Sequence, residues 1–333
     1  MTPILAVEHL SVEIGMRRGA LVAVDDVSFE IAPGEVLGLV GESGAGKSLT
    51  GTAVIGLLDA PLRKTRGRIL LAGRRIDDLP AQAMRALRGR RIGAVFQDPL
   101  TSLNPLLTVG RQLVQTILAH LDISAHEARK RAVLLLGEVG IPAVRERLDS
   151  YPHELSGGMR QRVVLALAFA CQPTLVVADE PTTALDVSIQ AQVIEVLKRM
   201  CRERGSAVLL ITHDMGVIAE TADRVAVMYA GRLVEVGPAR RMLAQPLHPY
   251  TRGLISSIPR MRAHRGMLSQ IDGSMPRLDA LPPGCSFHPR CPDRLPRCSL
   301  DRPQMLACGD GAAACWLTGP QPTGVQVEAA DRE

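Results

Sequence analysis

Residues 41–48 read Gly-Glu-Ser-Gly-Ala-Gly-Lys-Ser, which fits the pattern G-x-x-x-x-G-K-[ST]. In such a loop the glycines let consecutive backbone N–H groups turn toward one anion without a Cβ in the way. Lys47 can neutralise the β- and γ-phosphates of a nucleotide, and Ser48 can offer its hydroxyl to Mg²⁺. Residues 36–40 predict a buried strand, and residues 49–58 predict a helix whose dipole adds positive potential behind the loop. The stretch therefore predicts a strand–loop–helix unit that binds nucleotide phosphate.

The composition indicates a folded protein with an aliphatic core. Hydrophobic residues make up 46% of the 333 residues and aromatic residues only 2%, so Leu, Val, Ile and Ala must fill the interior. The net charge of +5 is small for this length, and aromatic platforms for bases are scarce, which argues against a nucleic-acid partner. No apolar run approaches the ~20 residues that cross a bilayer, and the N-terminus, with Glu8, does not resemble a signal peptide. We expect a cytosolic protein that acts at a membrane only through partners.

The order of apolar segments predicts a parallel α/β core. Alternating stretches within residues 1–35 indicate an antiparallel subsheet. Further strands are expected at residues 68–72, 92–96, 174–178, 207–211 and 224–229. The helix expected at residues 189–204 separates two of them, and strands separated by helices favour parallel pairing with right-handed crossovers. Residues from about 100 to 165 are helical in pattern and predict a subdomain inserted into the core.

The sequence changes character near residue 245. Beyond this point prolines accumulate, together with five of the seven cysteines, in a segment too irregular to be stabilised by packing alone. We therefore expect a nucleotide-binding domain at residues 1–245, a small C-terminal region at residues 246–318 and a disordered tail at residues 319–333.

A second motif, Leu155-Ser156-Gly157-Gly158, precedes a basic, glutamine-containing helix start. With the phosphate loop it resembles the signature of ATP-binding cassette (ABC) ATPases, and the likeness covers nearly the whole chain, especially to the ATPase subunits of bacterial dipeptide and oligopeptide importers. The resemblance implies an α/β fold of the ABC-type P-loop ATPase: a parallel α/β core, an antiparallel β subdomain, an inserted helical subdomain and here a small irregular Cys-rich appendage. Ser156 can cap the following helix so that its amides point outward. In the family this site meets the γ-phosphate bound by a second subunit.

The resemblance also assigns roles around the phosphates. Asp179 and Glu180 end an apolar strand, and they would hold Mg²⁺ through a water and act as general base for the attacking water, respectively. A strand that simply ends at a polar turn is the alternative, which the phosphate loop disfavours. Gln97 would reach Mg²⁺ and the water, His213 would contact the γ-phosphate and hold Glu180, and residues 183–186 would communicate between cassettes. The expected catalytic residues are Glu180, His213, Gln97 and Lys47, and the expected Mg²⁺ ligands are Ser48, Gln97 and Asp179.

The nucleotide contacts show one departure from the family. The family usually stacks adenine on an aromatic residue about 25 residues before the phosphate loop, but residues 15–20 here contain none. Arg17 or Arg18 could stack as a guanidinium plane, or Met16 could pack on the base. The expected nucleotide-binding residues are Gly41, Glu42, Ser43, Gly44, Ala45, Gly46, Lys47, Ser48, Leu49, Arg17, Ser156, Gly157 and Gly158.

The C-terminal region carries its own family features. Residues 246–251, Pro-Leu-His-Pro-Tyr-Thr, resemble the His-Pro-Tyr element of peptide and nickel importer ATPases. Four cysteines resemble the set that ligates a [4Fe–4S] cluster in members of this family: Cys285, Cys291, Cys298 and Cys315. Zn²⁺ is the first competitor, since four thiolates also suit zinc, and unligated thiols are the third option. Structural disulfides are not expected in a reducing cytosol, and Cys171 and Cys201 fit small core or surface residues.

Taken together, the resemblance implies an ATPase that energises a membrane importer of di- or oligopeptides or related small solutes through ATP-driven dimer closure and hydrolysis. ATP and Mg²⁺ are its expected ligands. Two membrane permease subunits, a second and distinct ATPase chain and an extracytoplasmic solute-binding protein are its expected partners, with the chain bound peripherally at the cytoplasmic face of the cell membrane. Two alternatives remain: a non-transport ABC ATPase, which would usually join two cassettes or carry a coiled-coil insert, and an iron–sulfur sensor that uses ATP.

Overall fold

The computed structural model describes residues 2–17, 19–182, 186–258 and 270–319. Within these ranges the strands form a four-stranded sheet of order β2-β1-β4-β5 and an eight-stranded sheet of order β11-β12-β10-β9-β3-β8-β7-β6. The smaller sheet contains β1 (Leu5–Gly15), β2 (Ala20–Ile31), β4 (Leu62–Leu71) and β5 (Arg74–Arg75). The larger contains β3 (Val36–Val40), β6 (Ile92–Val95), β7 (Leu175–Asp179), β8 (Ala207–Thr212), β9 (Arg224–Tyr229), β10 (Arg232–Pro238), β11 (Leu306–Cys308) and β12 (Gly311–Ala313). These sheets confirm the expected α/β core and antiparallel β subdomain.

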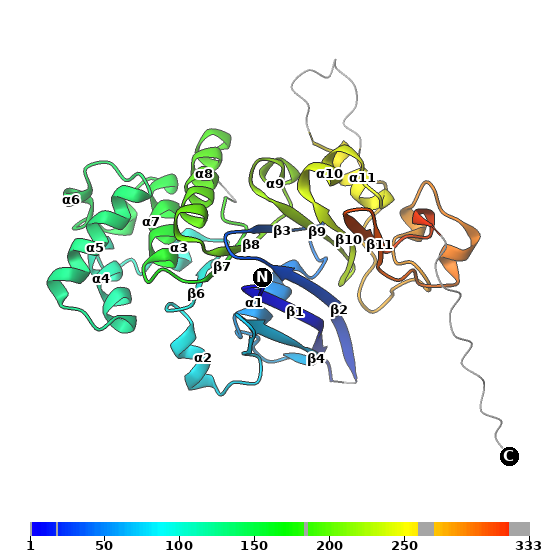
Figure 1. Ribbon diagram of the computed structural model, residues 1–333, viewed down its shortest axis with the longest axis horizontal. Coiled ribbons are helices and arrows are strands. Elements are labelled where there is room, and N and C mark those ends of the chain that lie inside the picture. The colour runs from blue at the N-terminus through cyan, green and yellow to red at the C-terminus, as the bar shows by residue number, and fades with distance from the viewer. Residues whose placement is uncertain (1, 18, 183–185, 259–269, 320–333) are drawn as a thin grey trace.

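The helices lie beside the sheets and beyond one end of the larger sheet (Figure 1). They are α1 (Lys47–Val54), α2 (Ala81–Leu87), α3 (Pro99–Ser102), α4 (Val109–His120), α5 (Ala125–Glu138), α6 (Val144–Arg147), α7 (Gly157–Phe169), α8 (Val187–Arg204), α9 (Met215–Thr221), α10 (Ala239–Ala244) and α11 (Pro249–Ser256). Short 3₁₀ turns lie at Pro152–Glu154, His288–Arg290, Pro296–Ser299 and Trp316–Thr318. Figure 1 shows α3 to α7 gathered at one end of the molecule and the C-terminal region at the other, with the sheets between them. None of the helices in the described part of the chain has both the length and the apolar character of a bilayer span.

The parallel pairing of the core strands agrees with the sequence prediction, but the strand expected at residues 68–72 is the end of β4 and belongs to the antiparallel sheet. β3 pairs in parallel with β8 and β9, and β7 pairs in parallel with β6 and β8. The smaller sheet is antiparallel throughout its described strands. One helix differs: the predicted helix at residues 49–58 ends at Val54, because Gly56 adopts a left-handed φ of 66° that closes the helix.

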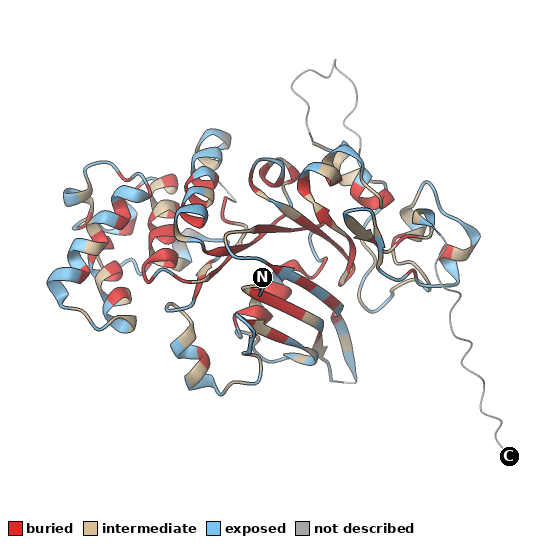
Figure 2. Cartoon of the chain, viewed as in Figure 1, coloured by how far each residue is buried: buried red, intermediate tan, exposed pale blue. Residues whose placement is uncertain are grey.

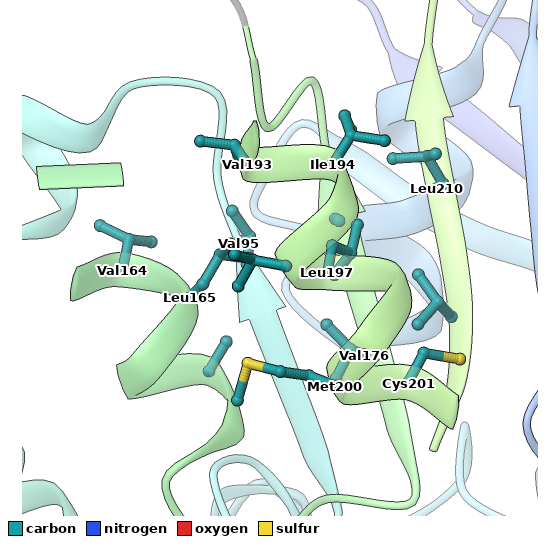
Figure 3. Packing of buried hydrophobic residues seen from close by; sticks show 14 of the residues in the cluster. Val95, Val164, Leu165, Val176, Val193, Ile194, Leu197, Met200, Cys201 and Leu210 are labelled. Atoms are coloured by element: carbon teal, nitrogen blue, oxygen red, sulfur yellow. The ribbon is translucent and has the colours of Figure 1, made fainter. Parts of the chain in front are cut away.

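The core has two halves because alternate residues of a strand point to opposite faces of the sheet. Val36 and Val40 face the cluster that α7 and α8 cover, whereas Leu37 and Leu39 face the cluster shared with the antiparallel sheet. Figure 2 shows the resulting buried band along the central strands, with exposed residues on the outer helix surfaces. Figure 3 shows how α8 packs on this sheet; the labelled side chains on that helix are Val193, Ile194, Leu197, Met200 and Cys201. This helical spacing confirms Cys201 as a core residue.

The C-terminal region joins the main core and sheet. β12 pairs antiparallel with β10, so the region extends the larger sheet. Tyr250 and Phe287 are buried in the same cluster as the residues of α8. These contacts connect residues on both sides of position 245, and the domain limits stay a prediction. Of the expected tail at residues 319–333, all but Gly319 lies outside the described residues.

A buried carboxylate fixes the His-Pro-Tyr turn to β10. Glu235 is fully buried and accepts hydrogen bonds from the backbone N–H groups of Leu247 (3.0 Å) and His248 (2.9 Å). Its other contact is an ion pair with Arg241 (2.7 Å). The Nδ1 atom of His248 then accepts the backbone N–H of Tyr250 at 3.0 Å and caps α11. Burial lowers the pKa of His248 to about 3, which keeps the ring neutral and able to accept this bond.

We predict that the buried His248 makes the protein less stable as the pH falls from about 7.5 to 5.5. Its pKa is lowered in the folded protein, so within this window the unfolded chain binds the extra proton and acid shifts the equilibrium toward unfolding. His248 alone should lower the free energy of unfolding by about 1.4 kcal/mol as the pH falls over these two units. Urea unfolding of wild type and His248→Asn, whose amide oxygen can still accept the Tyr250 N–H, should show a smaller acid loss in the variant. Equal losses in both proteins would contradict the prediction.

Candidate nucleotide-binding site

Four parallel strands of the larger sheet end side by side. Their order is β3, β8, β7 and β6, and the register keeps their carboxyl ends level. The residues that follow these ends are Gly41 after β3, His213 after β8, Glu180 after β7 and Gln97 after β6. Ligands of open α/β sheets bind at this edge. Residues widely separated in the sequence are thereby collected at one site.

The phosphate loop connects β3 to α1 and places Lys47 at its centre. Gly46 has a left-handed φ of 101°, and a Cβ there would lie 2.9 Å from the Met228 methyl group, so the position requires glycine. The buried Lys47 ammonium donates to the carbonyl oxygens of Gly41 (2.8 Å) and Glu42 (2.9 Å). Burial lowers the pKa of Lys47, although nearby carboxylates oppose the change. The loop thus holds the Lys47 ammonium in a fixed position from which it can bind phosphate.

Ser48 and Asp179 provide two neighbouring oxygen groups that suit a divalent cation. The Ser48 hydroxyl donates to Oδ1 of Asp179 at 3.2 Å. Burial raises the pKa of Asp179, and the neighbouring charge of Glu180 raises it further, whereas the bond from Ser48 lowers it. Mg²⁺ prefers such oxygen ligands at about 2.0–2.1 Å, and two oxygens this close can share one ion. The residues present therefore fit Mg²⁺.

Glu180 is held on three sides. It has a left-handed φ of 47°, a conformation that costs about 1–3 kcal/mol in a residue other than glycine. Its backbone N–H donates to the Ile211 carbonyl at 2.8 Å, which fixes this conformation. His213 Nδ1 lies 2.8 Å from Glu180 Oε1, and the Gln97 amide donates to Oε2 at 3.4 Å. The structure thus brings together Glu180, Gln97 and His213, the side chains that the resemblance assigned to the attacking water and to the γ-phosphate.

A cavity of about 520 Å³ opens in front of these groups. Its lining residues are Gly41, Glu42, Ser43, Gln97, Glu180, His213 and Leu254. Sequence reasoning missed Leu254, which comes from α11 in the C-terminal region. The His-Pro-Tyr element just before it was the available signal, but nothing in its spacing indicates that α11 reaches the phosphate loop.

The signature residues lie elsewhere in the subunit. The Ser156 hydroxyl accepts the backbone N–H of Met159 at 3.3 Å, which confirms its predicted cap of α7. At Gly158 a Cβ would meet Ile189 at 2.5 Å, so close packing on α8 requires glycine there. Ser156, Gly157 and Gly158 are not among the residues that line the cavity. Within this chain they do not complete the nucleotide site.

Two further predictions are only partly covered. Arg17 is exposed in the turn between β1 and β2 and is not among the lining residues of the cavity. Arg18 and residues 183–185 lie outside the described residues. The adenine contact therefore stays a prediction.

Four cysteines of the C-terminal region lie in one neighbourhood. Burial raises the pKa of Cys285 to about 11, and the thiols of Cys298, Cys315 and Cys291 add to the rise. The Cys285 N–H donates to the Cys298 carbonyl at 2.8 Å. None of the described cysteines is joined in a disulfide. Among the described residues, however, no three His, Cys, Asp or Glu side chains are arranged to hold a metal ion, so neither the zinc nor the iron–sulfur prediction gains support there.

Comparisons with known proteins agree with this geometry. Residues 24–183 match the family model "ABC transporter", and residues 234–298 match "Oligopeptide/dipeptide transporter, C-terminal region". The dipeptide transport ATP-binding protein DppD of Bacillus subtilis is 47% identical over 95% of this chain and 95% of its own. The chain belongs to the ATP-binding subunits of ABC transporters. It is an ABC ATPase, which binds ATP with Mg²⁺ and hydrolyses ATP to energise transport.

Further relatives extend the comparison. The oligopeptide transport ATP-binding protein OppD of Salmonella typhimurium is 46% identical over 89% of this ABC ATPase and 88% of its own length. Among solved structures, the dimeric ATP-binding cassette MJ0796 bound to ADP and Pi superposes with a TM-score of 0.64 at 28% identity. It covers 71% of this chain and 99% of its own. The cassette architecture is therefore shared with a protein solved as a dimer.

Replacing Lys47 with alanine should abolish tight ATP binding by this ABC ATPase. The ammonium is the only group of the loop described above that can place a full positive charge on the phosphates, and its charge-assisted bonds contribute about 1.5–3 kcal/mol each. Titration with a fluorescent ATP analogue should show affinity weakened by roughly 100-fold or more. Lys130→Ala, at an exposed position on α5, is the matched control. Tight binding retained in the Lys47 variant would contradict the role of this loop.

Proposed function

We propose that this chain is the ATPase subunit of an importer for dipeptides, oligopeptides or related small solutes. The observation that carries the proposal is the likeness, over nearly the whole length, to proteins named for dipeptide and oligopeptide transport, including the C-terminal region. In this proposal the subunit works at the cytoplasmic face of the membrane with two permease subunits and a solute-binding protein. The second ATPase is a distinct homologous chain.

We assign the chemistry of hydrolysis to the groups at the strand ends. Glu180 orients the attacking water and takes up its proton, since its carboxylate faces the cavity between His213 and Gln97. His213 holds this carboxylate in place, and Lys47 stabilises the charge on the phosphate oxygens. Mg²⁺, when bound, supplies charge neutralisation at the same oxygens, with Ser48 and Asp179 as its nearest candidates for ligands.

The signature residues belong, in this proposal, to the nucleotide site of the partner ATPase. Ser156 already uses its hydroxyl to cap α7, and the backbone amides of the first turn remain available to an anion beyond it. The absence of Ser156 from the lining of the cavity supports a site completed by another subunit. The dimeric cassette among the solved structures is a precedent for such an assembly.

Glu180→Gln should slow hydrolysis by roughly 10²–10⁴-fold, the usual contribution of a general base, while ATP binding persists. The variant should also stop uptake of a labelled dipeptide into vesicles that contain the permeases and both ATPases. Glu195→Gln, an exposed change on α8, is the matched control.

Because ATP stays bound in the Glu180→Gln variant, a crosslinker placed at Ser156 should reach the phosphate loop of the second ATPase. Normal turnover in the variant would contradict the assignment of the base, and wild-type vesicles that import no peptide would contradict the proposed cargo.

We also propose that Cys285, Cys291, Cys298 and Cys315 bind a [4Fe–4S] cluster. The proposal rests on their number and on the resemblance of the set to the cluster ligands of family members, since four thiolates are the usual ligands of such a cluster. Burial raises the pKa of Cys285, Cys291 and Cys315, so these thiols would have to release their protons on binding a metal.

Anaerobically purified protein should therefore show a broad visible absorbance band, together with bound iron and sulfide. Cys298→Ser should remove the band because one thiolate ligand is lost. Bound zinc without iron would assign the site to Zn²⁺, and a protein without either metal would mean unligated thiols. Either result would contradict the cluster.

A further inference from the structure

Glu42, the second residue of the phosphate loop, is held by two side chains of the C-terminal region. The guanidinium of Arg290 donates to both carboxylate oxygens, from one nitrogen at 2.7 Å and from the other at 2.9 Å. The hydroxyl of Tyr250 accepts the backbone N–H of Glu42 at 2.8 Å. A two-point Arg–carboxylate pair fixes orientation as well as position. The carboxylate and the amide of one residue are thus both fixed from the same distant part of the chain.

The backbone carbonyl of Glu42 connects these contacts to Lys47, the residue expected to bind the phosphates. Its carbonyl oxygen accepts one of the hydrogen bonds that hold the Lys47 ammonium, at 2.9 Å, beside the bond to Gly41. Any rotation of the Glu42 peptide therefore moves the acceptor that places Lys47. Glu42 also lines the cavity in front of Glu180. A shift of Glu42 would therefore change the position of Lys47 and the shape of the cavity expected to bind the phosphates.

Arg290 is itself rigidly placed. Its side chain is only 8% exposed, and its Nε donates to the Asp272 carbonyl at 2.8 Å. The guanidinium lies 5.9 Å from the centre of the Tyr229 ring and 6.0 Å from that of Phe287. Burial alone would lower the pKa of Arg290, but its bonds to Glu42 and Tyr229 raise it above the ordinary value. A buried charge anchored in this way cannot follow Glu42 elsewhere, so Glu42 must stay where the charge is.

Tyr250 is placed by an equally connected set of contacts. The chain has only three Tyr and four Phe residues, yet Tyr250, Tyr229 and Phe287 converge with ring centres 4.7–5.3 Å apart. The His248 ring fixes the Tyr250 backbone, and Glu235 fixes His248 to β10. The His-Pro-Tyr turn, which Glu235 attaches to β10, therefore places the Tyr250 hydroxyl against the phosphate loop.

We propose that Arg290 and Tyr250 are positioning residues for ATP, which set the phosphate loop and Lys47 through Glu42. We call these two residues the Glu42 clamp. The proposal rests on the proposed function of the loop in ATP binding, and it gives the His-Pro-Tyr element and the Cys-rich segment a direct part in it. A purely structural role, in which the contacts only attach the C-terminal region, makes a different prediction: lower stability with unchanged nucleotide binding.

The test compares four full-length variants: Arg290→Met, Glu42→Gln, the double variant and Tyr250→Phe. The phenylalanine keeps the ring packing and removes only the acceptor. ATP hydrolysis and the affinity for a fluorescent ATP analogue are measured, with melting temperature alongside. Arg297→Met is the matched control, because Arg297 lies in the same region, 3.7 Å over the Trp316 ring and paired with Asp301.

Arg290→Met should raise the KM for ATP about tenfold, equivalent to 1.4 kcal/mol, with a smaller change in kcat. Glu42→Gln should have a similar effect, and the double variant should be no worse than Arg290→Met because the two side chains act through one bond. Tyr250→Phe should also raise KM, whereas Arg297→Met should alter only the melting temperature. Wild-type KM in Arg290→Met and Tyr250→Phe, or additive effects in the double variant, would overturn the clamp. If wild type itself showed no ATP hydrolysis that depends on Lys47, the proposed function would fail instead.

Discussion

The register of β6, β7, β8 and β3 is the constraint on which the site depends. These strands are buried on both faces, so their apolar side chains specify the pairing, and a slip by one residue would turn every side chain to the wrong face. Because the register is fixed, the residues that follow each strand lie at the same edge of the sheet, and their positions do not depend on contacts between them. The strained backbone at Glu180 persists for the same reason: its N–H completes the pattern of β8 at Ile211.

The sheet also explains how one ABC ATPase combines a widespread cassette with a specialised C-terminal region. β10 continues from β9 by antiparallel pairing, and β12 then pairs with β10. Glu235 and the three aromatic rings fill the junction, so the C-terminal region is built on the same framework as the phosphate loop. A segment that looks like an appendage in the sequence is a neighbour of the nucleotide site in space.

Much of this arrangement could be predicted from local patterns. Short apolar runs predicted most parallel strands of the core to within a residue. The motifs and the family resemblance identified Glu180 and His213, whose side chains lie 2.8 Å apart, and Lys47, whose pKa burial lowers against the opposing charge of Glu180. The apolar pattern extends the first helix to residue 58, whereas Gly56, with its left-handed φ, ends α1 at Val54. Arg290 and Leu254 could not be found from the sequence, because their importance lies in contacts across the fold. An arginine beside cysteines indicates nothing about a glutamate in a distant loop until tertiary packing brings the two together.

The pairing of β12 with β10 has a consequence for the outer boundary of the sheet. β12 pairs with Glu235 and Val236 of β10, and without it the backbone of this stretch would form an open sheet edge that could recruit a strand from another molecule. β11 then forms the new margin, but it spans only Leu306–Cys308 and offers little backbone to pair with. The C-terminal hairpin thus covers a stretch of sheet edge that would otherwise be open to pairing with another chain.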